Sequence, residues 1–195
     1  REDFLYLADR GNHAVRRSRL HGGDVETVLG TGEVGRVRPH DSDARTTAIS
    51  NPGGVAVIAD KLYVLSTSQN QVWTLYLRRG RVRGRAGTGS LGMEAGLSLE
   101  ACFARPSGIS PSGLQLLIAD AASSSVRLVR LSDGRVKTRV GVGLYDFGDA
   151  SGNRDTARLQ NPLDVAMDPR GIVFIADTYN GRIKALSLKS GAVRT

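Results

Sequence analysis

Residues 173–183 read VFIADTYNGRI: an apolar run, a polar turn that begins with Asp177, and a return to an apolar residue at Ile183. The same order occurs three more times, as LYLADRGNHAV from Leu5, LYVLSTSQNQV from Leu62 and LLIADAASSSV from Leu116. The closing apolar residues of the four copies, Val15, Val72, Val126 and Ile183, are 57, 54 and 57 residues apart. Self-similarity at a fixed period identifies a repeat architecture.

Two further markers keep the same spacing. The triplets Gly30-Thr31-Gly32, Gly87-Thr88-Gly89 and Gly141-Val142-Gly143 are separated by 57 and 54 residues. The prolines Pro52, Pro106 and Pro162 are separated by 54 and 56 residues. Because three independent markers share one register, the sequence predicts four copies of a single structural unit.

Each full unit is predicted to form four short strands and no helix, since the apolar residues lack helical periodicity. The expected strands are 54–59, 61–66, 71–77 and 81–86 in the second unit, 107–110, 114–119, 125–131 and 135–140 in the third, and 163–167, 172–176, 182–188 and 192–195 in the fourth. The middle strands are apolar on both faces, as expected for small sheets packed between copies of themselves. This pattern predicts an all-β fold, the β-propeller.

The blades of this single, partial propeller are expected at about 1–32, 51–89, 105–143 and 161–195. The first lacks an inner strand and the last has a truncated outer strand, so the chain supplies about 3.5 units, whereas propellers close with about 4–8 blades. We therefore expect an open arc with unpartnered terminal faces. Buried positions between blades are predicted at Val64, Trp73, Leu75, Ile118, Phe174 and Ile175.

Polar residues mark the end of the second strand in every unit: Asp9, Ser66, Asp120 and Asp177. An Asp there is expected to accept backbone N–H bonds two residues on and to hold the reversal to the third strand. A carboxylate repeated in three of the four units, with Ser66 in its place in the second, indicates a structural turn rather than a catalytic group. Each connector between units is expected to be anchored by one apolar residue, Ile49, Phe103 or Leu159, three positions before its proline.

These residues resemble NHL repeats. Asn12-His13 followed by Val15 is close to the signature that names the family, and residues 175–183 are a near-consensus copy. The order of residues in the third and fourth units is similar to the branch in which a thioredoxin-like domain precedes a six-bladed propeller. The resemblance implies a non-catalytic protein-interaction scaffold without a cofactor, located in the cytoplasm, or in the chloroplast if the source is a plant or alga. It also leaves open an RNA-binding NHL propeller and, more distantly, a lyase-type enzyme.

Composition narrows the function classes. The chain has 195 residues with 27 basic and 19 acidic side chains, a net charge of +8, which permits acidic-protein, phosphate or nucleic-acid partners. No apolar run approaches the roughly 20 residues of a membrane span. A single cysteine, Cys102, excludes an internal disulfide and a CxxC redox pair within these residues.

The outer strands carry the clearest charge pattern. Alternation places Arg81, Arg83 and Arg85 on one face of one strand, and Arg135, Lys137 and Arg139 on one face of the next unit's equivalent strand. Two readings stay open: a basic rim for an anionic partner, preferably an acidic protein and otherwise RNA, or charges that protect an edge strand from association. Aromatic residues are sparse between these cations, which argues against a platform that stacks single-stranded bases.

Metal sites are weakly indicated. Asp149, Ser151, Asn153 and Asp155 occupy alternate positions, as in oxygen-rich calcium loops, but Gly152 and Gln160 do not fit an EF-hand, which favours a polar crossover loop. The three histidines, His13, His21 and His40, lack the spacing of zinc ligands. The sequence therefore predicts neither a metal nor a catalytic residue.

Overall fold

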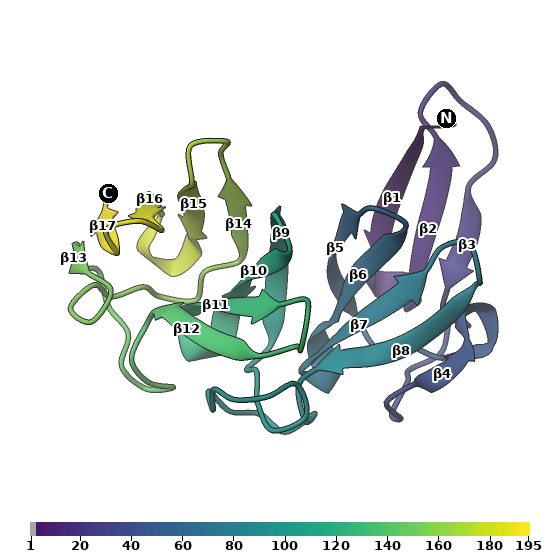
Figure 1. The fold of residues 1–195 in the computed structure, drawn as a ribbon, viewed down its shortest axis with the longest axis horizontal. Helices are drawn as coiled ribbons and strands as arrows, with labels where there is room; N and C mark the ends of the chain where they lie inside the picture. The colour runs from purple at the N-terminus through teal and green to yellow at the C-terminus, as the bar shows by residue number, and fades with distance from the viewer. Residues whose placement is uncertain (1–2) are drawn as a thin grey trace.

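A computed structural model describes residues 3–195, which form four antiparallel sheets arranged as an open arc (Figure 1). The described part of the chain contains strands and short 3-10 turns but no α-helix. Within it, no helix is long and apolar enough to cross a membrane. The all-β propeller architecture expected from the repeat is confirmed.

The sheets follow one another along the chain, and we call them blades 1 to 4. Blade 1 holds β1 (Phe4–Asp9), β2 (Ala14–Arg19) and β3 (Glu26–Leu29). Blade 2 holds β5 (Pro52–Ile58), β6 (Lys61–Ser66), β7 (Gln71–Tyr76), β8 (Arg81–Ala86) and, beside β8, β4 (His40–Asp43). Blade 3 holds β9 (Pro106–Ser112), β10 (Gln115–Asp120), β11 (Ser125–Arg130) and β12 (Val136–Val140). Blade 4 holds β14 (Asp164–Met167), β15 (Ile172–Asp177), β16 (Arg182–Ser187), β17 (Ala192–Arg194) and, beside β17, β13 (Gly152–Asn153).

The repeat-derived strands agree with this topology to within two residues at each end, but the connectors contain more structure than expected. Before it reaches the next inner strand, a connector runs along the outer strand of the blade it is entering. There β4 pairs with β8 and β13 pairs with β17. In blade 3, Gly96 makes an isolated bridge to Val136. The prediction of four strands per blade was therefore incomplete, because these segments are polar and lack the alternation by which strands are identified.

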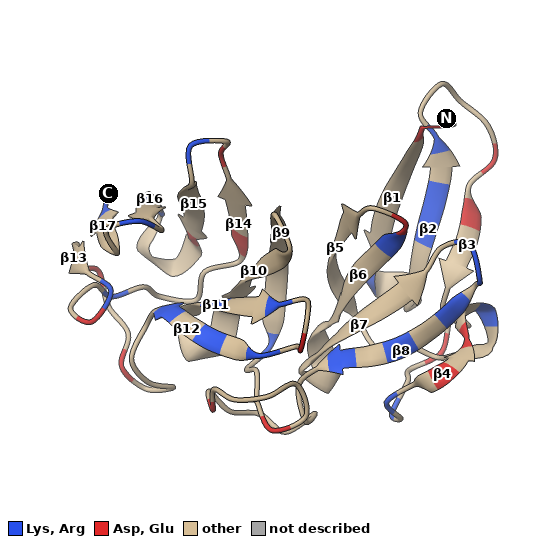
Figure 2. Cartoon of the chain, in the orientation of Figure 1, with Lys and Arg blue, Asp and Glu red and all other residues tan. Residues whose placement is uncertain are grey.

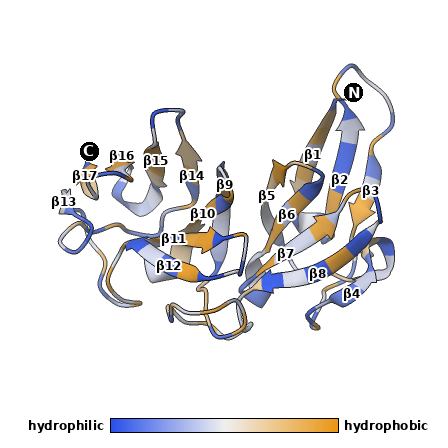
Figure 3. Cartoon of the chain, in the orientation of Figure 1, coloured by the Kyte–Doolittle hydropathy of each residue, from blue (hydrophilic) through white to orange (hydrophobic). Residues whose placement is uncertain are grey.

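Three hydrophobic clusters fill the three interfaces between adjacent blades. The connector residues Ile49, Phe103 and Leu159 are fully buried, one in each cluster, which confirms their role as anchors. Figure 3 shows the hydrophobic colour on β1, β10 and β15, whereas β8 and β12 carry hydrophilic segments. Of the predicted core residues, Val64, Trp73, Leu75, Ile118 and Ile175 are buried.

Phe174 is the exception, and its predicted burial was wrong: the residue is 41% exposed. Neighbouring residues of a strand face opposite sides, so Ile175 packs toward blade 3 while Phe174 points to the uncovered side of blade 4. Ile183 lies on that same face of blade 4 and is 62% exposed. At the other end of the arc, Leu5 and Leu7 of β1 are exposed as well. Both terminal blades therefore present apolar side chains to solvent.

Candidate functional site

The aspartates of blades 3 and 4 connect each of these blades to its incoming connector. Asp120 ends β10, and its Oδ1 accepts a hydrogen bond of 2.7 Å from the backbone N–H of Ala104, while Oδ2 accepts one of 2.8 Å from the Ser123 hydroxyl. Asp177 makes the matching bonds with Gln160 N, at 2.7 Å, and the Asn180 amide, at 2.8 Å. The expected acceptance of backbone N–H groups two residues on was wrong, because these carboxylates make no side-chain bond to the backbone of their own turn. They hold the connector instead.

Blade 2 makes the same connection without a charge. Ser66 occupies the aspartate position and donates a 2.6 Å hydrogen bond to Oε1 of Gln69. That same oxygen accepts the connector's Ser50 N–H at 3.2 Å. The amide oxygen of Gln69 therefore takes the place of the carboxylate, and the departure from the consensus at both positions is a coordinated replacement.

In the other blades a cation accompanies the aspartate, seven residues further along, and in blades 3 and 4 it is buried. Arg127 lies 3.2 Å from Asp120, with both side chains fully buried, and Lys184 lies 3.4 Å from Asp177. In blade 1, Arg16 pairs with Asp9 at 3.1 Å, more openly. The equivalent position in blade 2 is Trp73, which is fully buried and donates its indole N–H to the Gln71 side chain at 2.8 Å. Sequence reasoning missed this pair, although the seven-residue spacing was visible.

The buried cations also bind connector carbonyls. Arg127 donates to the carbonyls of Cys102 and Glu94, each at 3.1 Å, and its guanidinium carbon lies 5.5 Å from the centroid of the Phe103 ring. Lys184 donates to the Arg158 carbonyl at 2.7 Å. Burial lowers the pKa of Arg127, against the opposing effect of the Asp120 charge. The charged ends of Arg127 and Lys184 are bonded to connector carbonyls and to the blade aspartates. This arrangement indicates a structural rather than catalytic role.

The loop considered for calcium is held by cations. Asp149 Oδ1 lies 2.8 Å from the Lys184 ammonium, and Oδ2 lies 2.6 Å from the Arg182 guanidinium. The hydrogen bond from Lys184 keeps the pKa of Asp149 below its ordinary value. Among residues 3–195, no cluster of three or more His, Cys, Asp or Glu side chains is placed to hold a metal ion. Both carboxylate oxygens of Asp149 are therefore engaged with cations of blade 4.

His13 has a structural partner across the first blade interface. Its Nδ1 accepts a 3.1 Å hydrogen bond from the backbone N–H of Asn51, the residue before the proline of blade 2. The equivalent acceptors are Asn70 for Arg105, at 2.9 Å, and Ser124 for Asn161, at 3.2 Å. All six residues have positive φ angles between 46° and 56°. At each interface, the side chain of one residue with a left-handed backbone thus accepts a hydrogen bond from the backbone N–H of another such residue.

We expect His13→Asn to leave the free energy of unfolding nearly unchanged, because Asn tolerates a left-handed backbone and supplies an amide oxygen, as Asn70 does. His13→Ala leaves the Asn51 N–H without its acceptor, which should cost about 1–2 kcal/mol. Urea denaturation followed by tryptophan fluorescence of Trp73 measures both. An equal loss in the two variants would show that the acceptor contributes nothing.

The six cations of the outer strands do not form one shared rim. One cation of each trio contacts the following blade: Arg85 donates to the Leu131 carbonyl of blade 3, and Arg139 donates to the Leu188 carbonyl of blade 4 at 3.3 Å. Arg81 lies 3.6 Å from Asp41 and also donates to the carbonyl of that residue. Figure 2 shows the cations along β8 and β12. Because β4 covers the edge of β8, these charges do not protect a free edge there, and that reading was wrong for blade 2.

A basic pocket occupies the gap between blades 3 and 4. Its volume is about 290 Å³, and it is lined by Gln115, Leu128, Arg130, Arg135, Lys137, Arg139 and Leu188. One carboxylate, Asp133, lies beside Arg130 at 2.9 Å and Arg135 at 3.9 Å. Lys137 is exposed and makes no hydrogen bond or ion pair with the described residues. We call this site the blade 3–4 pocket.

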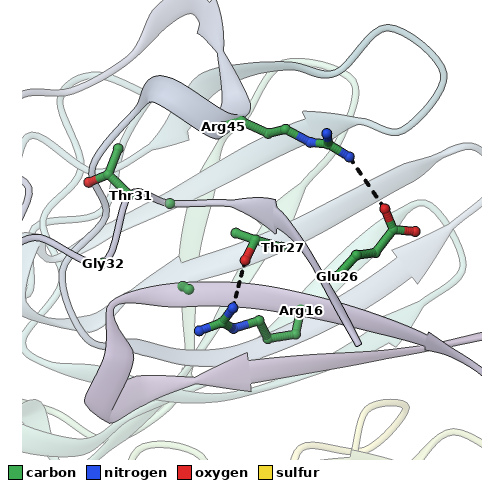
Figure 4. A pocket seen from close by; sticks show the side chains of 8 residues that line it. Arg16, Glu26, Thr27, Thr31, Gly32 and Arg45 are labelled. Atoms are coloured by element: carbon green, nitrogen blue, oxygen red, sulfur yellow. Dashed lines mark hydrogen bonds and ion pairs between the residues drawn. The ribbon is translucent and has the colours of Figure 1, made fainter. Parts of the chain in front are cut away.

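A second pocket lies at the open edge of β3 and has a volume of about 520 Å³ (Figure 4). Arg16 donates to the Thr27 hydroxyl at 2.7 Å, and Arg45 lies 3.3 Å from Glu26. Arg17 holds the pKa of Glu26 below its ordinary value by a hydrogen bond. Each of the charged side chains that line this pocket therefore has a hydrogen-bond or ion-pair partner, whereas Lys137 of the blade 3–4 pocket has none among the described residues.

Comparison with known proteins identifies the repeat. The NHL repeat family model matches residues 159–186. Human NHL repeat-containing protein 2 is 32% identical over 96% of this chain and 30% of its own length, and the bovine protein is 34% identical over the same shares. The chloroplastic protein SUPPRESSOR OF QUENCHING 1 of Arabidopsis thaliana is 30% identical over 95% of this chain and 19% of its own length. The chain thus spans less than a third of these relatives.

Solved structures agree on the fold. A structural genomics protein from Bacteroides thetaiotaomicron superimposes with a TM-score of 0.74 at 22% identity, covering 98% of this chain and 44% of that protein. Virginiamycin B lyase from Staphylococcus aureus does so with a TM-score of 0.60 at 10% identity, covering 97% of this chain and 50% of the lyase. At such identities the likeness concerns architecture alone. The repeats of this chain are NHL repeats, and its four sheets are consecutive blades of an NHL-type β-propeller.

Proposed function

We propose that this propeller is a non-catalytic protein-interaction scaffold within a larger protein that also carries a thioredoxin-like domain. The proposal rests on one observation: the buried charged side chains have structural partners, whereas the exposed cations lie at the outer strands. Asp120, Arg127, Asp177 and Lys184, the buried ionisable groups, are engaged in holding connectors. Exposed cations such as Lys137 lie instead at the outer strands, where a partner has access.

Lyase chemistry receives no support from the residues present. His13, the histidine nearest a blade interface, uses Nδ1 to accept a backbone N–H. The likeness to the Staphylococcus lyase is one of fold at 10% identity. An enzyme would need an acid or base facing a substrate pocket, and the buried acids here face connectors.

RNA is the second candidate, because the outer strands of two adjacent blades carry three cations each. A polyanion would be expected to follow a continuous basic surface. The two trios are divided between separate blade gaps, and Arg85 and Arg139 are engaged with carbonyl groups across those gaps. This division favours local contacts with an acidic protein.

We propose a cytoplasmic location. The chloroplast is the alternative for a plant or alga, in keeping with the name of the Arabidopsis relative.

Quantitative mass spectrometry of proteins retained by the immobilised full-length protein tests the scaffold proposal. Cell extract is applied with and without ribonuclease. We expect a defined set of proteins to be retained in both conditions and to be reduced by joint reversal of Arg83 and Lys137 to Glu. Loss of all retained proteins after ribonuclease treatment would favour the RNA-binding alternative instead.

A further inference from the structure

We propose that the blade 3–4 pocket binds a short acidic peptide segment in which carboxylates flank an apolar side chain. This inference rests on the scaffold function and assigns the chemistry of one contact surface. The residues that line the pocket belong to blades 3 and 4, and all of them lie within the described part of the chain.

The walls of the pocket carry more positive charges than negative ones. Four cations, Arg130, Arg135, Lys137 and Arg139, surround a site with one adjacent carboxylate, Asp133. Asp133 accepts from Arg130 and from the backbone N–H of Arg135, at 3.0 Å, and these bonds keep its pKa well below the ordinary range. Lys137 stays without an acid partner and Arg139 has a carbonyl partner alone. An incoming carboxylate would therefore find donors that no internal acid satisfies.

Two apolar residues line the pocket. Leu128 is 7% exposed and offers little surface, so the apolar contact is made mainly by Leu188, which is partly buried and packs against the cluster that joins blades 3 and 4. A peptide that brings only charge would leave this surface in contact with water, whereas an apolar side chain between two acidic ones would cover it. A pocket of about 290 Å³ has room for a side chain and not for a folded element.

The gap between blades 2 and 3 differs from the blade 3–4 pocket at a few lining positions. The residue equivalent to Leu128 is Thr74, and the one equivalent to Arg130 is Tyr76. Lys61 lies 5.6 Å from the centre of the Tyr76 ring, so its charge is already placed over an aromatic face. The blade 2–3 gap thus also has four cations, Lys61 and the basic trio of its outer strand, and it keeps an apolar residue, Leu131, at the position of Leu188. It differs in having the polar Thr74 in place of Leu128 and in directing one of its cations onto the Tyr76 ring.

Fluorescence anisotropy of a labelled peptide in which glutamates flank one leucine, titrated with the full-length protein, tests the assignment. We expect Lys137→Glu to weaken binding about tenfold or more, since it reverses a charge at the contact. Arg10→Glu, on an exposed turn of blade 1, makes the same charge change and should alter binding less than about twofold. If Lys137→Glu unfolds the protein, Lys137→Gln replaces it, with a smaller loss expected in the same direction.

A peptide with serine in place of the leucine should bind several-fold more weakly. Equal binding by Lys137→Glu and Arg10→Glu would overturn the site, and equal binding by the serine peptide would overturn the apolar contact. Competition by oligouridine RNA at the same concentration as the peptide would also overturn the assignment. In each case proteins retained after ribonuclease treatment would still support the scaffold function, so the two failures can be told apart.

Discussion

Arg127→Met is expected to lower the free energy of unfolding by about 3–5 kcal/mol, among the largest effects of any single substitution in this chain. The change leaves Asp120 buried without its cation, and it also removes the donor to the Cys102 and Glu94 carbonyls. Burial already raises the pKa of Asp120, so the uncompensated carboxyl would be expected to take up a proton in the variant. Urea denaturation of the full-length protein measures the loss.

The double variant Asp120→Asn/Arg127→Met is the matched control. Asn at 120 keeps an oxygen for the Ala104 N–H and carries no charge, so the double variant should lose less stability than Arg127→Met alone. Arg170→Met removes a cation from an ion pair that is 82% exposed on the arginine side, and little change is expected there. A double variant less stable than the single one would show that the charge pairing is not the source of the loss.

The 195-residue chain produced on its own is expected to self-associate. Its two end faces are apolar and different: Phe174 and Ile183 lie on blade 4, and Leu5 and Leu7 on blade 1. Contacts between unlike faces are head-to-tail, and they propagate unless the arrangement closes. Light scattering after size exclusion should show a mass that rises with protein concentration.

Phe174→Ser combined with Ile183→Ser should shift that mass toward the monomer by making one end face polar. Val37→Ser, which changes an isolated exposed residue in a connector, serves as the control and should leave the mass unchanged. A monodisperse monomer with one cooperative unfolding transition in the unmodified chain would contradict the prediction.

The strands of each repeat could be predicted closely because several independent sequence markers share the same period. The turn positions, the glycine triplets and the prolines each give the period independently, and the anchor residues Ile49, Phe103 and Leu159 follow from it. The edge strand β4 could not be predicted, because its sequence, His-Asp-Ser-Asp, has no apolar alternation and its pairing is determined by β8.

The burial of Phe174 was mispredicted for a different physical reason. Both faces of β15 carry apolar residues, so the pattern alone does not distinguish the face that packs on blade 3 from the opposite one. The role of Asp120 was missed in part because its backbone partner, Ala104, lies 16 residues earlier in the chain. The basic trios were found in the sequence, but their division between two blade gaps depends on which way each strand faces.

The neutral connection in blade 2 has an evolutionary consequence. Ser66, Gln69 and Trp73 replace an aspartate, its hydrogen-bonding neighbour and a buried cation, so a repeat cannot pass from one arrangement to the other by independent steps. Asp at 66 would bury a carboxylate without the cation that pairs with it in blades 3 and 4, and Arg at 73 would bury a cation without its carboxylate. Each change is unfavourable alone and tolerated with the other, which is sign epistasis. Sequence drift among the blades should therefore keep positions 66 and 73 changing together, whereas the hydrogen-bonding neighbour is free to vary, as Ser123 and Asn180 show beside Asp120 and Asp177.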